Sequence, residues 1–265
     1  MNALMTAAKP TVLSSLADRL AKGETLLSAW CGLPDPSIAA ILAQEDFDAV
    51  TLDMQHGPIT LAEVIRAIPL INAAGKPALA RIPVGEFQNV SKLFDSGASG
   101  VIAPMINTIE DARRLAAYAK YPPLGERSWG SYGGLGASGL DQNGYLRLAN
   151  SFSLTFAMIE TREALAIVDD ILALEGIDAL FVGPSDLSIA LSGGASVNAS
   201  AKEVDDALRH IVARANAVKK PVAFYAASAE RAAEGVALGA RLVTVMSDTG
   251  FLRHAAQAAL KIARG

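Results

Sequence analysis

Two carboxylates that follow strand-like segments could hold a divalent cation. Glu160 ends the apolar segment TFAMIE, and Asp186 follows the apolar segment ALFVGP. Carboxylates brought close together repel each other unless a proton or a cation lies between them. Oxygen ligands that leave several positions open suit Mg²⁺ or Mn²⁺ with waters and a chelating substrate. Two structural roles stay open: Asp186 could cap the following helix, and Glu160 could pair with Arg162 or Arg81.

Arg81, His56 and Trp30 also lie where strand-like segments end. A guanidinium is costly to bury unpaired, and Asp53 is the natural partner of Arg81. A carboxylate in that role can orient the guanidinium toward a second, anionic oxygen. His56 follows Asp53 in the run DMQHGP and could be a general base or an ordinary solvated loop histidine.

The turn Gly183-Pro184-Ser185-Asp186 leads from a predicted strand into a helix. Its free backbone N–H groups could hold a carboxylate or a phosphate, although a plain strand-to-helix connection has the same sequence features. No lysine lies at a predicted strand end, which disfavours imine catalysis and leaves electron withdrawal to a metal. Cys31 is predicted to be a small buried hydrophobe, and His210 and His254 surface or packing residues.

Short apolar segments bounded by Gly, Pro or Asp must position these side chains. Most lack apolar/polar alternation, as is typical of parallel strands covered on both faces. About eight such segments alternate with helical patterns, which is the number in a (β/α)8 TIM barrel, where chemistry sits at the carboxyl ends of the strands. We therefore expect residues 1–265 to form a single barrel domain. The predicted strands are 26–30, 49–54, 77–82, 100–105, 155–160, 179–184, 221–226 and 242–247.

The exception to this regularity is the glycine-rich segment 121–150. It contains a formal G-x-G-x-x-G at Gly134, Gly136 and Gly139, but it does not directly follow a strand, so a dinucleotide site is rejected. A long glycine-rich loop in an enzyme is either an active-site cover or a subunit contact.

Composition excludes several classes of protein. The chain has 265 residues, of which 51% are hydrophobic, and a net charge of −4 without a basic stripe, so nucleic acid is not an expected partner. The mean hydropathy is +0.31, yet no stretch approaches the ~20 apolar residues of a membrane span. The first 20 residues are predicted to form a helix and not a signal peptide. A single cysteine fits a reducing compartment, and we expect a cytoplasmic protein.

Taken together, six motifs resemble the HpcH/HpaI aldolases, the class II pyruvate aldolases. They follow the order of that family over about residues 26–190, with weaker similarity toward the C-terminus. The motifs are LDMQHG, ARIPV, KLFDSGASGVIAPM, YPPLGERSWG, AMIETREAL and GIDALFVGPSDLS. The resemblance implies a divalent metal, Mg²⁺ or Mn²⁺ with Co²⁺ as a third candidate, held by Glu160 and Asp186. It also implies that pyruvate or a related 2-oxo acid chelates this metal.

The resemblance assigns roles to the remaining site residues. The backbone N–H groups of Ser185 and Asp186 would bind the substrate carboxylate, and Arg81 would stabilise the enolate oxygen. His56, in a dyad with Asp95, would activate a metal-bound water or hydroxide that moves the aldol proton. In addition, Asp53 would brace Arg81, and Trp30 would line the pocket.

The implied reaction is reversible aldol cleavage of a 4-hydroxy-2-oxo acid into pyruvate, or a hydroxypyruvate-like donor, and an aldehyde. Some relatives carry Glu in place of Gln55 and Gln in place of Met158, which changes the polarity of the pocket. A CoA-thioester lyase of the citrate lyase or malyl-CoA lyase type is the alternative with the same fold. A non-catalytic 2-oxo-acid binder is the alternative from another class. The family also implies a homohexamer with a domain-swapped C-terminal helix, with which the tail FLRHAAQAALKIAR is compatible.

Overall fold

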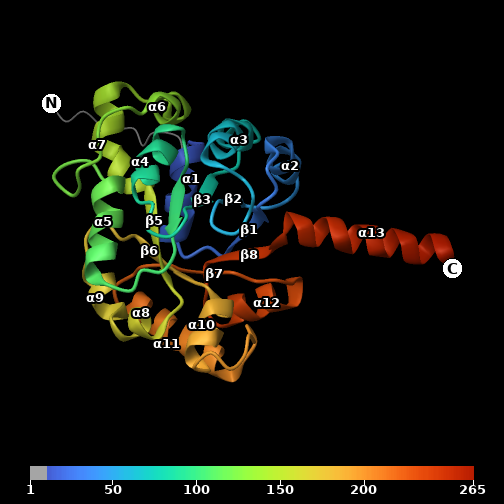
Figure 1. Cartoon of the computed structure of the whole chain (residues 1–265). Coiled ribbons are helices and arrows are strands. Elements are labelled where there is room, and N and C mark those ends of the chain that lie inside the picture. The colour runs from blue at the N-terminus through green and yellow to red at the C-terminus, as the bar shows by residue number, and fades with distance from the viewer. Residues whose placement is uncertain (1–10) are drawn as a thin grey trace.

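Eight parallel strands form a closed barrel, with helices between them along the chain (Figure 1). The computed structural model describes residues 11–265. Neighbours in sequence are neighbours in the sheet, and β1 closes the barrel by pairing with β8. The prediction of a (β/α)8 barrel is therefore confirmed. The strands are β1 (Leu26–Cys31), β2 (Ala49–Asp53), β3 (Ala78–Arg81), β4 (Gly100–Ala103), β5 (Leu154–Ile159), β6 (Ala179–Val182), β7 (Val222–Phe224) and β8 (Leu242–Ser247).

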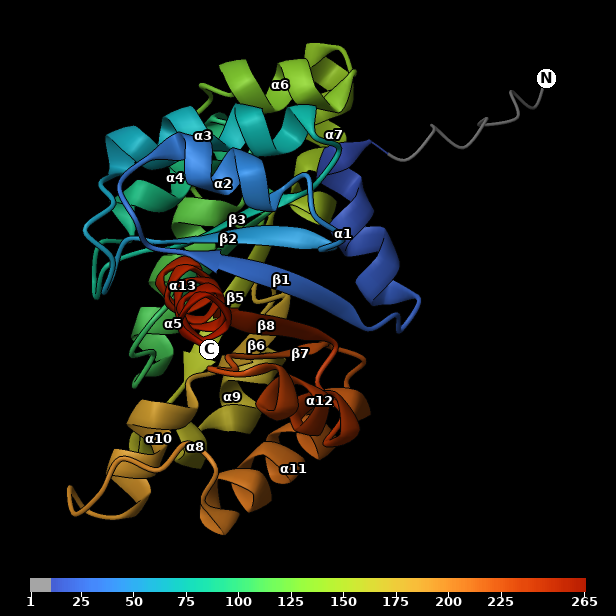
Figure 2. The same cartoon turned by 90° about the vertical axis from the view of Figure 1, so that its right-hand side faces the viewer.

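Most helices cover the outside of the barrel, and their buried faces pack on the outer face of the sheet (Figures 1 and 2). The C-terminal helix instead projects away from the barrel. Within the described residues, no helix is both long and apolar enough to cross a membrane. The helices are α1 (Val12–Ala21), α2 (Pro36–Leu42), α3 (Leu61–Ala73), α4 (Gln88–Asp95), α5 (Ile109–Ala119), α6 (Tyr132–Ser138), α7 (Gln142–Phe152), α8 (Arg162–Ala166), α9 (Val168–Ala173), α10 (Pro184–Leu191), α11 (Lys202–Ala217), α12 (Ala229–Ala237) and α13 (Asp248–Arg264).

Helix α1 closes the amino-terminal end of the barrel. Its side chains Leu16 and Leu20 join the cluster that fills the barrel interior, together with Leu26 and Leu242 from the first positions of β1 and β8. Part of the helix predicted for the first 20 residues is thus confirmed, and residues 1–10 lie outside the described part of the chain. Because this end is closed by apolar side chains, the site must open at the other end.

Alternation along the strands selects the side chains that point inward. Successive strand residues face opposite sides of the sheet, so a residue two positions after an interior residue is also interior. Leu79 and Phe156 belong to the interior cluster, and Arg81 and Met158 follow them by two positions. Asp53 pairs in register with Arg81 on the neighbouring strand. The charged interior residues Asp53 and Arg81 therefore lie in the layer nearest the carboxyl ends.

The glycine-rich segment does not cover the site of its own chain. It forms α6 and α7, which pack against α1 and α4. None of its residues lines the central cavity described below. Of the two predicted alternatives, a cover over the cavity of the same chain is therefore wrong, because the segment packs against α1 and α4, and a subunit contact stays a prediction. Gly134 and Gly136 lie within α6, so the G-x-G-x-x-G does not form a turn between a strand and a helix.

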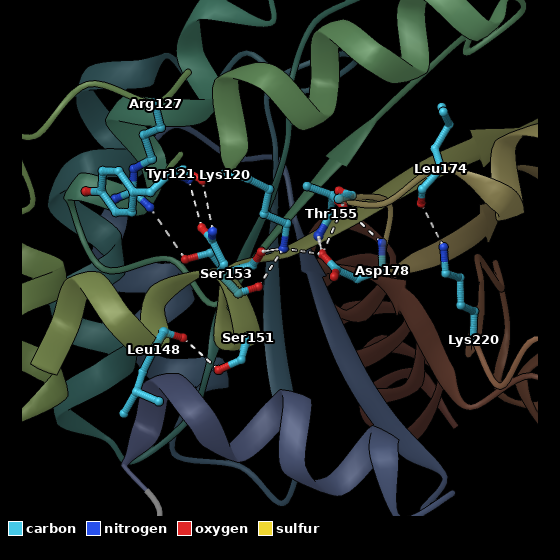
Figure 3. Close-up of polar contacts among 12 residues, drawn as sticks. Lys120, Tyr121, Arg127, Leu148, Ser151, Ser153, Thr155, Leu174, Asp178 and Lys220 are labelled. Atoms are coloured by element: carbon cyan, nitrogen blue, oxygen red, sulfur yellow. Dashed lines mark hydrogen bonds and ion pairs between the residues drawn. The ribbon is translucent and has the colours of Figure 1, made fainter. Parts of the chain in front are cut away.

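A buried lysine joins the helices to the sheet near the start of β5 (Figure 3). Lys120 is 1% exposed. Its Nζ donates to the carbonyl oxygens of Asn150 and Ser153, at 2.9 and 2.7 Å, and to Asp178 Oδ2 at 2.7 Å. Asp178 Oδ2 also accepts the backbone N–H of Thr155 at 2.7 Å. Burial lowers the pKa of Lys120, while the charge of Asp178 raises it. This lysine is therefore a structural connector and not an imine nucleophile.

Replacing Lys120 by Met should destabilise the fold by about 3–5 kcal/mol, because Asp178 and two carbonyl groups lose the donor that they share. Urea unfolding measures the change, and the activity per folded molecule should stay at the wild-type level. The matched control is Lys202→Met, which breaks an exposed pair with Asp206 and should cost less than about 1 kcal/mol. Equal losses in the two variants would contradict the role of Lys120.

Candidate active site

A cavity of about 310 Å³ lies at the carboxyl ends of the strands. Its walls come from residues at the ends of β1, β2, β3, β5, β6, β7 and β8. Seven of the eight predicted site residues line it, the exception being Asp95. These seven are Trp30, Asp53, His56, Arg81, Glu160, Ser185 and Asp186.

Glu160 is the most unusual side chain of the cavity. It is 1% exposed, and its Oε1 accepts the backbone N–H of Met105 at 2.7 Å. Its Oε2 is buried without a hydrogen-bond partner among the described residues. Burial raises the pKa of Glu160 to about 7; the Met105 hydrogen bond opposes this shift and the nearby charge of Asp186 adds to it. A buried carboxylate oxygen without a donor is costly unless a cation or a proton satisfies it.

The sequence places Met105 at the end of a predicted strand segment but gives it no role. Its backbone φ of 54° lies in the left-handed region, which non-glycine residues seldom adopt. This conformation accompanies the hydrogen bond from its N–H to Glu160. A strained backbone thus fixes one oxygen of Glu160 and leaves the other free.

Gly183 and Asp186 complete the surroundings of the free oxygen. A Cβ added to Gly183 would lie 2.4 Å from Glu160 Oε2, so only glycine leaves room for this carboxylate. Gly183 is the N-cap of α10, and no side chain in residues 11–265 caps this helix. Asp186 is therefore not a helix cap, which removes the structural alternative for it. The N–H groups of Ser185 and Asp186 lie in the first turn of α10, where they have no helical acceptor.

The ion-pair alternative for Glu160 does not hold either. Arg162 donates to the carbonyl oxygens of Ala190 and Leu191. Arg81 instead donates from Nε and Nη2 to the two carboxylate oxygens of Asp53, at 2.7 and 2.6 Å. Among residues 11–265, no cationic side chain lies within ion-pair distance of Glu160. Its negative charge is left for a ligand to neutralise.

Arg81 is held rigidly in an orientation that suits anion binding. The bidentate pair with Asp53 is buried, and the guanidinium carbon lies 4.8 Å from the ring centroid of Trp30. Trp30 Nε1 donates to Asp53 Oδ2 at 3.2 Å, which orients the carboxylate in turn. The pair with Asp53 uses Nε and Nη2 of Arg81, so Nη1 is available for an anionic oxygen in the cavity.

His56 lies on the exposed rim of the cavity, in the turn after β2. Asp95, its predicted partner, is the last residue of α4 and lies outside the cavity. The Asp95 carboxylate instead accepts a hydrogen bond from Arg127 Nη2 at 2.7 Å. The predicted dyad is therefore not formed within one chain, because helix α4 carries Asp95 to the Arg127 side.

The structure adds residues whose roles the sequence did not indicate. Tyr225 follows β7, and its ring meets Trp30 edge-on at 5.2 Å. Burial raises the pKa of Tyr225. Asp248 follows β8 and lines the cavity, although it is only 2% exposed. Cys31, His210 and His254 have no place in the cavity: Cys31 is buried, and the two histidines lie on exposed faces of α11 and α13, as predicted.

The donor set fits a divalent cation that is bound by few protein ligands. Glu160 and Asp186 supply oxygen ligands, and the orphaned Glu160 Oε2 lies in the space that Gly183 leaves. No cluster of three or more His, Cys, Asp or Glu side chains with the geometry of a metal site is found in residues 11–265. Two carboxylates leave most coordination positions to waters and a substrate, which is typical of Mg²⁺ or Mn²⁺.

In cation-free buffer, the Glu160→Gln variant should be more stable than the wild type above pH 7. The pKa of Glu160 is raised from 4.5 to about 7, so its contribution to stability is present below pH 4.5 and lost as the pH rises through 7. We expect a difference of about 3 kcal/mol at pH 8 that vanishes at pH 4.5, measured by urea unfolding with a chelator present. The exposed Glu163→Gln variant should show no such pH dependence. A difference that grew toward low pH would contradict the raised pKa.

Comparisons with known proteins show relatives of nearly the whole chain. The family model of the HpcH/HpaI aldolase/citrate lyase family matches residues 27–255. The chain is 38% identical to a hydroxypyruvate/pyruvate aldolase of Rhizorhabdus wittichii, over 92% of this chain and 96% of the relative. It is 30% identical to a 2-keto-3-deoxy-L-rhamnonate aldolase of Shigella sonnei, over 94% of this chain and 90% of the relative.

A solved structure shares the same fold over nearly the whole chain. The HpcH/HpaI aldolase from Desulfitobacterium hafniense superposes with a TM-score of 0.85 and 27% identity, covering 94% of this chain and 96% of that one.

Proposed function

The chain belongs to the HpcH/HpaI aldolase/citrate lyase family and is a carbon–carbon lyase, and on that premise we propose that it catalyses reversible aldol cleavage of 4-hydroxy-2-oxo acids. The products would be pyruvate, or a hydroxypyruvate-like donor, and an aldehyde. The observation that carries the proposal is the pair Glu160 and Asp186, in one cavity with an Arg81 whose Nη1 is free. The aldolase names of the relatives support the same reaction.

Glu160 and Asp186 would hold Mg²⁺ or Mn²⁺, with Co²⁺ as a further candidate. When bound, such a cation supplies positive charge that polarises the ketone of a 2-oxo acid. The N–H groups of Ser185 and Asp186, at the amino end of α10, would bind the substrate carboxylate. Trp30 lines the wall and packs against Tyr225, and together they limit the volume beside the donor.

In the cleavage direction, His56 takes the proton from the 4-hydroxyl group of the substrate. The bond between C3 and C4 breaks, its electron pair moves onto the 2-oxo fragment as an enolate, and C4 leaves as an aldehyde. Arg81 Nη1 stabilises the negative charge that develops on the enolate oxygen. Transfer of this proton from His56 to C3 then gives pyruvate and restores the neutral imidazole. Asp53 holds the guanidinium in place throughout, through its two hydrogen bonds.

The test is an aldol assay with a chelator arm. Pyruvate or hydroxypyruvate is incubated with a panel of aldehydes, and the adduct is followed by chromatography. Activity should disappear after exhaustive cation removal and return with Mg²⁺ or Mn²⁺. Full activity without cation would overturn the mechanism. Inactivation by borohydride in the presence of pyruvate would indicate an imine lysine instead, and turnover of glyoxylate with acetyl-CoA would indicate a CoA-thioester lyase.

We also propose that the protein is a cytoplasmic homohexamer in which α13 is exchanged between subunits. This helix projects away from the barrel (Figures 1 and 2), and its side chains Leu252, Leu260 and Ile262 are 59%, 49% and 83% exposed. Since Arg127 holds Asp95 outside the cavity of its own chain, the predicted pair with His56 requires Asp95 of a neighbouring copy.

Light scattering should give about six times the 27.5-kDa mass of the chain. A stable monomer with full activity would contradict both the exchanged helix and the shared dyad.

A further inference from the structure

Asp248 links the first turn of the C-terminal helix to the loop that follows β1. It is the first residue of α13 and is 2% exposed. Its Oδ2 accepts the backbone N–H groups of Gly32 and Leu33, at 2.9 and 2.8 Å. Its Oδ1 accepts the N–H of Thr249 at 2.7 Å. Both carboxylate oxygens are therefore occupied by backbone donors.

This carboxylate is not needed to begin α13. Ser247 is the N-cap, and its Oγ accepts the N–H of Gly250 at 3.2 Å. In the described part of the chain, no cationic side chain forms an ion pair with Asp248. Burying a carboxylate without a cation is costly, and here only backbone N–H groups compensate it. The arrangement favours a role in holding the loop that carries Gly32 and Leu33.

The end of β8 is bent so that Asp248 reaches this loop. Met246 has a φ of 56°, in the left-handed region that non-glycine residues seldom adopt. The pairing of β8 with β1 shifts register at the same point, so that Trp30 lies opposite Ser247. Backbone strain of this kind persists only where surrounding contacts stabilise it, and it clusters at functional sites.

The loop held by Asp248 lies directly against the turn that carries His56. A Cβ added to Gly57 would lie 2.6 Å from the carbonyl oxygen of Gly32 and 2.7 Å from its Cα. The two backbones therefore touch, with no side chain between them. Because Gly57 is bonded to His56, a movement of Gly32 would press on the turn that carries the imidazole.

We propose that Asp248 is a positioning residue that sets the place of His56 through Gly32 and Gly57. The proposal rests on the proposed function only in taking His56 as the proton-transfer group. The donor-binding groups Arg81, Glu160 and Asp186 belong to β3, β5 and α10. Within the described residues, none of these three side chains forms a hydrogen bond with the loop of Gly32 and Leu33 that Asp248 holds. Loosening this loop should therefore affect proton transfer more than donor binding.

The test is the isosteric Asp248→Asn variant, in which an NH₂ group replaces one of the two oxygens that accept backbone N–H groups. We expect kcat to fall about 10- to 100-fold, because a shift of about 1 Å in a catalytic group costs up to 10² in rate. The KM for pyruvate should change less than about threefold. Hydrogen–deuterium exchange should rise at Gly32, Leu33 and the turn 54–58, which needs no activity to be measured.

The matched control is Asp35→Ala, at the other end of the same loop. Asp35 caps α2 by accepting the N–H of Ser37 at 2.8 Å and does not line the cavity. Its loss should raise exchange in α2 alone and leave kcat within about twofold. An Asp248→Asn protein with wild-type kcat, or with unchanged exchange at 54–58, would overturn the proposal. A wild-type protein inactive on every aldehyde would instead refute the proposed function, while the exchange measurement would still decide the role of Asp248.

Discussion

Replacing Glu160 by Gln should lower kcat for aldol cleavage by about 10³-fold or more. A loss of this size is expected when the cation that stabilises the negative charge of the transition state is no longer bound. Gln keeps the acceptor for the Met105 N–H, so the backbone at the end of β4 should stay in place. What the variant lacks is the anionic Oε2, the buried oxygen that has no partner among the described residues. The expected defect is therefore loss of cation binding in an intact fold.

Two measurements separate these effects. Titration calorimetry with Mn²⁺ should show binding to the wild type and not to Glu160→Gln, while circular dichroism should be the same for both. Glu163→Gln, an exposed change three residues along the chain, should leave binding and kcat unchanged. Mn²⁺ binding of wild-type strength in Glu160→Gln would rule out Glu160 as a ligand. Asp186→Asn should lose both binding and activity if the two carboxylates share one cation.

Replacing Arg81 by Lys should lower kcat about 10²- to 10³-fold, although the charge is kept. An ammonium group cannot reproduce the planar fork that meets both oxygens of Asp53 and leaves a third nitrogen for the substrate. Arg81→Met should in addition destabilise the fold by about 3–5 kcal/mol, because Asp53 would stay buried without its cation. Activity follows from the aldol assay and stability from urea unfolding.

The chain offers a matched control for Arg81. Arg214 makes the same bidentate contact with Asp169, at 2.6 and 2.8 Å, but on the exposed surface. Arg214→Met should cost less than about 1 kcal/mol and leave kcat unchanged. If the buried and exposed pairs responded alike, burial would not be the reason for the effect at Arg81. If Arg81→Lys kept wild-type kcat, the free Nη1 would have no part in stabilising the enolate.

The strands and most of the site were predictable from local patterns. Apolar segments bounded by Gly, Pro or Asp mark all eight strands, because strands covered on both faces need continuous apolar side chains. Closure of eight parallel strands then brings their carboxyl ends to one mouth. For this reason Glu160, Arg81 and Asp186 meet in one cavity, although each comes from a different part of the chain.

Contacts between distant loops and helices were not predictable from those patterns. The sequence alone left Asp186 between metal ligand and helix cap, and only the N-cap position of Gly183 removed the second role. It placed Met105 and Asp248 at strand ends but gave them no role, since their roles depend on left-handed backbone at Met105 and Met246. It left the glycine-rich segment between an active-site cover and a subunit contact, and the family resemblance paired Asp95 with His56. In the structure α1 and α4 hold the segment away from the cavity, and Arg127 binds Asp95.

Residue types and strand ends thus determine the barrel, the acidic pair and the class of chemistry, because the hydrophobic pattern and strand direction are local properties. Three features depend on the closed barrel and not on local sequence. They are the burial of Glu160, the orientation of Arg81 and the hydrogen bond between Asp248 and Gly32. The reason is physical: a carboxylate acquires a raised pKa or an unmet oxygen from the atoms packed around it, and those atoms come from strands and loops far away in the sequence.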